Sequence, residues 1–165
     1  MSRPRPNLQT LLTVLPVLLL LVVIALAAGA PAQTRGSEAE AKALLDKVTL
    51  YLRQNGAASA ADAFARRDGA FVDRDLYPML IDRQGVMVAH GWTPALNGAN
   101  LMEMRDIEGR PFIREALGLM EMGDAGAVPY RWTDPLSGQV AARTMHVRRI
   151  VLEGAPYMLS VGVHR

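Results

Sequence analysis

Apolar residues follow three different patterns along this 165-residue chain. A nearly continuous apolar run lies close to the N-terminus, a helical spacing follows it, and much of the second half alternates between apolar and polar positions. The helical spacing is typical of amphipathic helices, and the alternation is typical of half-buried strands. We therefore expect a folded domain of helices and strands after the apolar run.

The clearest helix begins at Ser37. One face of this segment carries four apolar side chains: Leu44, Val48, Tyr51 and Leu52. Ser37 and Glu40 have the spacing of a capping box, in which the two side chains satisfy backbone N–H groups at the start of a helix. Gly56 suits the end of a helix, so we predict a helix over residues 37–55.

Strands dominate the remainder of the chain. The last of them contains YMLSVGV, in which large apolar residues alternate with residues that include Ser160 and Gly162. The predicted elements are helices at residues 37–55, 58–67 and 111–122, one helical turn at 101–105, and strands at 76–81, 86–90, 127–133, 139–150 and 155–163. An antiparallel sheet with helices covering one of its faces defines an α+β domain.

The N-terminal segment has the three-part layout of a secretory signal. A basic start precedes TLLTVLPVLLLLVVIALAAG, and small residues suit cleavage after Ala32. We predict a signal peptide over residues 1–32 and a linker over 33–37. The run at residues 11–28 nearly reaches the ~20 apolar residues that cross a bilayer, so an uncleaved signal anchor is the alternative. The rest of the chain would then be periplasmic or secreted, or anchored outside the cytoplasm.

Composition excludes several classes of function. The chain has no cysteine, which rules out disulfides, thiolate metal sites and a cysteine nucleophile. Removing Arg3 and Arg5 from its 18 basic residues leaves 16, equal to its 16 acidic residues. The exported part is thus formally neutral and has no basic arm, so we expect no nucleic-acid partner.

The order and spacing of several short motifs resemble the single Cache domain, an extracytoplasmic PAS-like sensor module. The segment that carries the resemblance reads GAFVDRDLYPMLIDRQGVMVAHGWTPALNGANLMEMRDIEGRPFIREAL, and YRWTDPLSGQV follows it. The resemblance covers residues 38–165. It implies a long N-terminal helix, a five-stranded antiparallel PAS-like sheet, and a small-molecule pocket on one face of that sheet. Similar pockets take small carboxylates in sensor domains of chemoreceptors and histidine kinases.

Six residues are candidates for binding such a ligand: Tyr77, His90, Tyr130, Trp132, Arg143 and His146. The family pattern has a lysine and, three residues later, a tyrosine where this chain has Arg143 and His146. An arginine can hold a carboxylate through two hydrogen bonds. Tyr130 and Trp132 share a strand face because they are two residues apart.

Structural roles remain open for each candidate. His90 ends a strand that should be buried, and it is either a binding group at a pocket rim or only a polar strand end. Arg143 could instead face water or pair with an acidic side chain. Asp73 and Asp75 could cap or solvate the start of a strand.

Neither catalysis nor metal binding is expected. The histidines at positions 90, 146 and 164 have no metal-ligand spacing, and no motif for a nucleophile or a phosphate loop is present. We expect no cofactor, and we do not expect an enzyme.

The expected function is extracytoplasmic binding of a small organic ligand, and the resemblance favours a carboxylate. Its partner would be a separate membrane receptor, kinase or transporter, and the domain could form a homodimer. The alternative is a structural or dimerising interaction domain without a functional pocket, which apolar side chains filling the pocket would favour.

Overall fold

The computed structural model describes residues 35–67 and 69–165. The predicted signal peptide at residues 1–32 lies outside this part of the chain. The described elements are α2 (Glu38–Asn55), η1 (Ala57–Ser59), α3 (Ala60–Ala65), β1 (Pro78–Asp82), β2 (Met87–His90), η2 (Pro94–Leu96), α4 (Phe112–Met122), β3 (Ala125–Thr133), β4 (Val140–Leu152) and β5 (Ala155–His164). None of the helices within the described ranges is both long and apolar enough to cross a bilayer.

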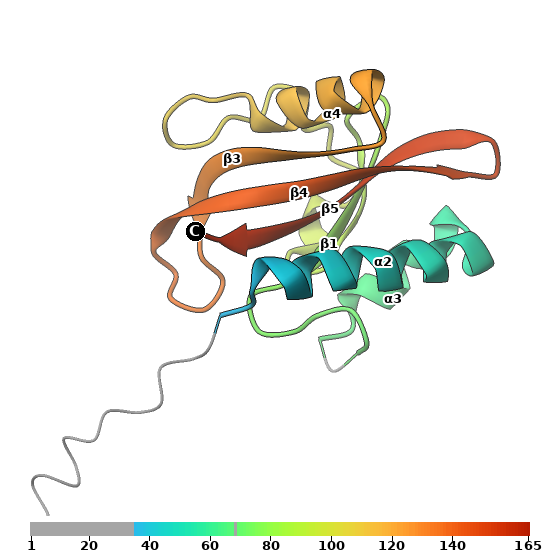
Figure 1. Ribbon diagram of the computed structural model, residues 1–165, viewed down its shortest axis with the longest axis horizontal. Coiled ribbons are helices and arrows are strands. Elements are labelled where there is room, and N and C mark those ends of the chain that lie inside the picture. The colour runs from blue at the N-terminus through green and yellow to red at the C-terminus, as the bar shows by residue number, and fades with distance from the viewer. Residues whose placement is uncertain (1–34, 68) are drawn as a thin grey trace, which may run out of the picture. The chain divides into compact units, whose positions relative to one another are not determined.

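The five strands form one sheet in the order β2-β1-β5-β4-β3, with every neighbouring pair antiparallel (Figure 1). β5 therefore lies at the centre, between β1 and β4. A two-residue turn joins β4 to β5, and both of its residues have positive φ, 53° at Glu153 and 82° at Gly154. This combination matches the twist of the strands in a tight hairpin.

Helix α2 begins as the sequence predicts. The Glu40 backbone N–H donates to Ser37 Oγ at 3.3 Å, and the Ser37 backbone N–H donates to Glu40 Oε2 at 2.7 Å. Gly56 follows the helix with a φ of 75°, which favours glycine at this position. The capping box and the glycine thus fix both ends of the helix.

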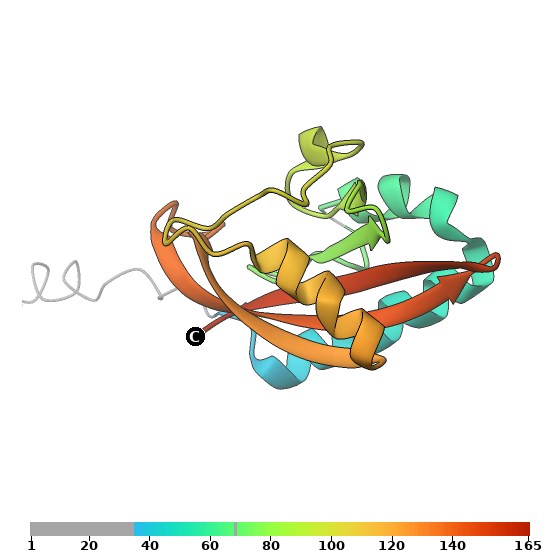
Figure 2. The ribbon, with the colours of Figure 1, turned by 90° about the horizontal axis from the view of Figure 1, so that it is seen from above.

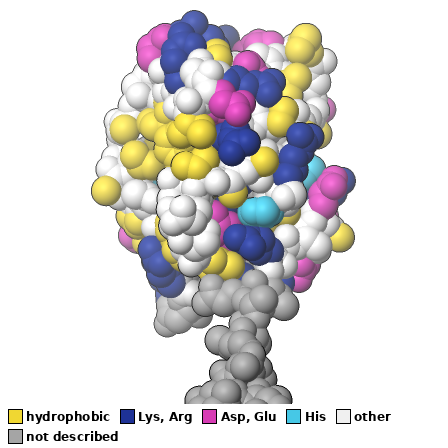
Figure 3. All heavy atoms as spheres, turned by 90° about the vertical axis from the view of Figure 1, so that its left-hand side faces the viewer, with side chains coloured by type: hydrophobic (Ala, Val, Ile, Leu, Met, Phe, Trp, Pro, Cys, Tyr) yellow, Lys and Arg dark blue, Asp and Glu magenta, His cyan; other side chains and the backbone are white. Residues whose placement is uncertain are grey.

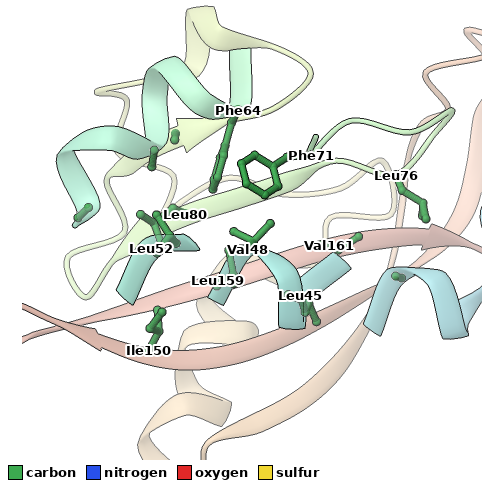
Figure 4. Packing of buried hydrophobic residues seen from close by; sticks show 14 of the residues in the cluster. Leu45, Val48, Leu52, Phe64, Phe71, Leu76, Leu80, Ile150, Leu159 and Val161 are labelled. Atoms are coloured by element: carbon green, nitrogen blue, oxygen red, sulfur yellow. The ribbon is translucent and has the colours of Figure 1, made fainter. Parts of the chain in front are cut away.

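Helices α2 and α3 pack against one face of the sheet. Their buried apolar side chains, among them Leu45, Val48, Leu52 and Phe64, meet Ile150, Leu159 and Val161 from the strands (Figure 4). This cluster contains mainly alternate residues of β5, because successive side chains of a strand point to opposite faces.

Helix α4 lies on the other face, across the sheet from α2 (Figures 1 and 2). Its residues Phe112 and Ile113 belong to a second buried cluster with Tyr130, Met145 and Met158. The α+β class and the five-stranded antiparallel PAS-like sheet predicted from the sequence are confirmed. The prediction that all helices cover one face of the sheet is wrong, because α4 covers the face opposite α2. The periodicity of a helix shows which of its sides is apolar, but it does not show which face of the sheet that side covers.

The loop between β2 and α4 also differs from the prediction. Residues 101–105 contain turns and no helix, whereas a short 3₁₀ helix occupies Pro94–Leu96. Pro94 stands in the first turn of this helix, where its missing N–H is not needed.

Candidate functional site

A small cavity of about 30 Å³ lies on the α4 face of the sheet. Four of the predicted site residues line it: Tyr77, His90, Tyr130 and Trp132. Four methionines also line it: Met79, Met87, Met104 and Met145. Pockets for small molecules usually measure about 300–1,000 Å³, so this one is nearly filled by its own side chains.

Aromatic rings form two stacks around the cavity. The ring of Tyr77 stacks on that of His90 at 5.1 Å between centroids, and Phe112 stacks on Tyr130 at 4.9 Å. Trp132 packs against Phe112 at 5.6 Å. Offset stacking of this kind holds rings in defined orientations, so the walls of the cavity are ordered.

His90 is held by the loop that follows it. Its Nδ1 accepts hydrogen bonds from the backbone N–H groups of Trp92 at 3.1 Å and Thr93 at 2.9 Å. The ring proton must therefore sit on Nε2 when the imidazole is neutral. Burial lowers the pKa of His90 to about 4, so the side chain is a neutral N–H donor at neutral pH.

Arg143 is completely buried beside the two tyrosines. Its Nη2 donates to the backbone carbonyls of Asp75 at 3.1 Å and Gly162 at 2.9 Å. Its Nε and Nη1 have no hydrogen-bond partner among the described residues. The guanidinium carbon lies 5.8 Å from the centre of the Tyr77 ring, so Arg143 sits behind the tyrosines and does not itself line the cavity.

The tyrosine hydroxyls stay protonated in this environment. Burial raises the pKa of Tyr77, and burial likewise raises the pKa of Tyr130. Both phenols therefore remain potential hydrogen-bond donors beside the arginine.

Gly162 makes room for this arrangement. A Cβ atom at this position would overlap with the Tyr130 hydroxyl and would lie 3.4 Å from Arg143 Nε. The small side of the last strand, noticed in the sequence, thus accommodates a tyrosine and an arginine.

His146 lies on the opposite side of the sheet. Its Nε2 is 3.7 Å from Glu38 Oε1 at the start of α2, and burial lowers its pKa. Residues three apart on a strand point to opposite faces, so Arg143 and His146 cannot face the same cavity. The structure brings five of the six predicted residues together and separates His146 from them.

Two buried carboxylates belong to the site although the sequence analysis did not select them. Asp75 is fully buried, and its Oδ1 accepts a hydrogen bond from the Gly36 backbone N–H at 2.7 Å. Asp134 Oδ2 lies 3.9 Å from Arg143 Nη1. Asp75 belongs to the motif DLY and Asp134 to the motif TDPLSG. From the sequence alone, the start of a strand explains the first aspartate and a turn explains the second, without any role in a site.

Asp134 is ionised despite its burial. Burial opposes ionisation, but hydrogen bonds from the Ser137 backbone and from Arg35 outweigh it and lower the pKa of Asp134 to about 2. The carboxylate therefore supplies a fixed negative charge beside Arg143.

The surface at the end of the domain that carries the β3–β4 turn mixes both signs of charge beside a hydrophobic patch (Figure 3). Arg110 pairs with Glu115 at 2.6 Å, and Arg131 pairs with Glu108 at 3.4 Å. Such exposed pairs contribute about 0–1 kcal/mol each, so the buried arginine is the charged group that distinguishes the site.

The sheet order and the helices on its two faces define a PAS-like α+β fold. A model of the family described as Single Cache domain 2 matches residues 21–155. The chain belongs to this family.

Known proteins agree with this assignment. The chemotaxis protein McpP of Pseudomonas putida, a methyl-accepting protein, is 32% identical over 76 residues, which are 46% of this chain and 14% of that protein. This chain therefore matches only a small part of its relative's length.

Solved structures share the fold. A methyl-accepting chemotaxis protein from Vibrio parahaemolyticus has a TM-score of 0.63 and 21% identity, over 77% of this chain and 87% of that one. A Cache chemosensory domain, solved to explain carboxylic acid recognition, has a TM-score of 0.56 and 23% identity, over 73% of this chain and 83% of that one. A periplasmic sensor domain of a chemotaxis protein has a TM-score of 0.56 and 22% identity, over 77% of this chain and 94% of that one.

Proposed function

We propose that this domain binds a small organic carboxylate in the cavity on the α4 face. The observation that carries the proposal is Arg143, a fully buried cation whose Nε and Nη1 make no hydrogen bond among the described residues. Its Nη1 lies 3.9 Å from the Asp134 carboxylate, too far for a hydrogen bond, whereas a bound carboxylate could accept two hydrogen bonds from one guanidinium. The related Cache domain that recognises a carboxylic acid supports the same ligand class.

Five residues would bind the carboxylate ligand. Arg143, which lies behind the tyrosines, would supply positive charge and would reach the ligand after a shift of Tyr77 and Tyr130. The Nε2–H of His90 and the hydroxyls of the two tyrosines would donate hydrogen bonds. Trp132 would form an apolar wall. His146 is left out because it faces α2.

The size and lining of the cavity limit the ligand. A cavity of about 30 Å³ fits only a few atoms unless side chains move. Methionine side chains adapt their shape easily, so the four that line the cavity allow some expansion. We therefore propose a short monocarboxylate.

The location and partners of the protein extend the proposal. Residues 1–32 would act as a signal peptide, or residues 11–28 as a membrane anchor, and 33–37 as a linker to the Cache domain at 38–165. The domain would then act outside the cytoplasm with a separate membrane receptor, kinase or transporter, and homodimerisation is compatible with this role. No catalytic activity is proposed.

Thermal unfolding of the full chain with acetate, propionate and lactate tests ligand binding. An acid present at 100 times its dissociation constant should stabilise the protein by about 2.7 kcal/mol. Arg143→Met should abolish this stabilisation. The matched control is Arg148→Met, on the same strand, whose guanidinium pairs instead with Asp46 at 2.7 Å on the α2 side. Stabilisation that survives Arg143→Met would contradict the assigned site.

A second function is favoured by the small size of the cavity. Side chains fill most of the space where a ligand would sit, as expected for a structural or dimerising interaction domain with a vestigial pocket. Stabilisation by none of the acids, together with a stable dimer of the full chain, would favour this alternative.

A further inference from the structure

The segment just before α2 is tied to the two buried aspartates of the site. Arg35 Nε donates to Asp134 Oδ2 at 3.2 Å, and the Gly36 backbone N–H donates to Asp75 Oδ1 at 2.7 Å. Gly36 is buried, and a Cβ atom there would overlap with the side chain of Leu76. The position of this segment therefore depends on groups in the loop before β1 and in the turn after β3.

The same two aspartates contact the buried arginine. Asp134 Oδ2 accepts from Arg35 and lies 3.9 Å from Arg143 Nη1, so two guanidinium groups share one carboxylate oxygen. The backbone carbonyl of Asp75 accepts from Arg143 Nη2 at 3.1 Å. One buried polar cluster thus joins the candidate ligand site to the segment that precedes α2.

The rest of Asp134 is fixed by its own turn. Its Oδ1 accepts from the backbone N–H groups of Leu136 at 3.0 Å and Ser137 at 2.8 Å, and from the Ser137 hydroxyl at 3.0 Å. These bonds leave Oδ2 as the oxygen that faces both arginines. Because the Asp134 carboxylate is held in one orientation, a change in the charge around Arg143 alters the interaction between Asp134 and Arg35.

We propose that Asp134 couples anion binding at Arg143 to the ordering of residues 35–37. This inference rests on the proposed function, since it needs an anion at Arg143. The negative charge of the anion offsets the repulsion between the two arginines and draws the guanidinium of Arg143 toward itself. Asp134 Oδ2 then interacts mainly with Arg35, and the Arg35–Asp134 ion pair, which fixes the segment before α2, becomes stronger. Because coupling between two sites is reciprocal, losing Arg35 must weaken anion binding.

The segment involved gives this coupling a use. Where residues 11–28 act as an anchor, residues 35–37 lie between that anchor and α2, so their ordering would report the state of the ligand site toward the membrane. Asp134 is a positioning residue in this scheme, because it acts through the two arginines.

Hydrogen exchange of the full chain, measured by mass spectrometry with and without acetate, tests the coupling. Acetate should slow exchange in peptides that cover residues 35–41 of the wild type. Arg35→Ala should remove this response and weaken acetate binding about fivefold, within the range of ordinary coupling energies. Arg35→Lys keeps the charge and should restore much of both effects.

Lys42→Ala is the matched control. It also removes a basic residue and an ion pair from the same region, since Lys42 pairs with Glu38 at 2.7 Å, but that pair is separate from Asp134. It should leave acetate affinity and the exchange response unchanged.

The outcomes separate the coupling from ligand binding. If the wild type binds acetate and exchange at residues 35–41 does not slow, the coupling is overturned and the proposed function stands. If Arg35→Ala weakens binding but keeps the exchange response, the effect is one of long-range charge and the coupling is again overturned. If acetate does not bind the wild type, the coupling through acetate is overturned, and the failure of propionate and lactate as well would overturn the proposed function.

Discussion

Among single residues, His90 shows most clearly how a polar group can be both structural and available for binding. Its Nδ1 closes the loop after β2 by accepting two backbone N–H groups, and this fixes its tautomer. The remaining Nε2–H belongs to a ring that lines the cavity. The two explanations offered by the sequence, a strand end and a binding group, are therefore compatible in one side chain.

The stability of the protein should depend on His90 below neutral pH. Its pKa falls from 6.5 to about 4 on folding, so the unfolded chain takes up a proton that the folded domain does not. The stabilisation is fully present above pH 6.5 and is lost as the pH falls toward 4. We expect a loss of about 3 kcal/mol from this group, measured by urea unfolding at several pH values.

His90→Asn is the reference for this measurement. Its side-chain oxygen can replace Nδ1 as an acceptor, but it does not titrate in this range. Subtracting its pH profile from that of the wild type removes the contribution of the acidic residues. Parallel profiles for the two proteins would contradict the predicted role of His90.

The sequence could reveal the residue types of the site but only part of its arrangement. Tyr77, His90, Tyr130 and Trp132 lie in the motifs of the family pattern, and strand alternation also predicts that Tyr130 and Trp132 share a face. His146 was included although the same alternation places it opposite Arg143. Asp75 and Asp134 were not selected, because their importance arises from contacts with Arg35, Gly36 and Arg143, which are distant in sequence.

Among the elements, β5 determines how closely the other parts can approach. One side of this strand carries Leu159, Val161 and Val163 toward α2, and the other carries Ser160 and Gly162, of which Gly162 lies against Arg143 and Tyr130. The sequence predicted this alternation, but it could not show that the space above the small residues is taken by side chains from β3 and β4. For the same reason it could not place α4.

Gly162→Ala adds only one methyl group, but we expect it to disturb the site strongly. The added methyl group overlaps with the Tyr130 hydroxyl, which belongs to a rigid ring, so Tyr130 or Arg143 must move. We expect a loss of about 1–3 kcal/mol in the free energy of unfolding and weaker binding of carboxylates. Chemical denaturation and acetate titration measure the two effects.

Gly118→Ala is a suitable comparison. Gly118 lies within α4, and a Cβ atom there would meet nothing within 4 Å. An alanine in a helix is more stable than a glycine by about 1 kcal/mol, so this variant should gain stability and bind as the wild type does. Equal behaviour of the two variants would show that the space at Gly162 is not critical.

At the scale of the whole domain, one sheet separates two hydrophobic cores that differ in composition. The core beneath α2 and α3 is aliphatic and aromatic, whereas the core beneath α4 contains methionines, tyrosines and the cavity. Damage to the two cores should therefore have similar effects on stability and different effects on binding.

Leu52→Ala and Met145→Ala compare the two cores. Both side chains are fully buried, so each truncation should cost about 2–5 kcal/mol in unfolding experiments. Met145→Ala also enlarges the cavity, so it should shift preference from acetate toward longer acids such as butyrate, measured as the ratio of their dissociation constants. Leu52→Ala should leave this ratio unchanged. A shift in Leu52→Ala as large as that in Met145→Ala would show that the cores are not independent.

The order of the strands also affects how the protein is made. β5, the last of the five strands, is the central one, and it is the only link between the β2–β1 pair and the β4–β3 pair in the described sheet. A ribosome must therefore finish this strand before the two pairs can join, and a domain folds as a unit once its elements are available. The sheet therefore stays incomplete until residue 164 has been synthesised. This delay suits a polypeptide that is proposed to cross a membrane before it folds.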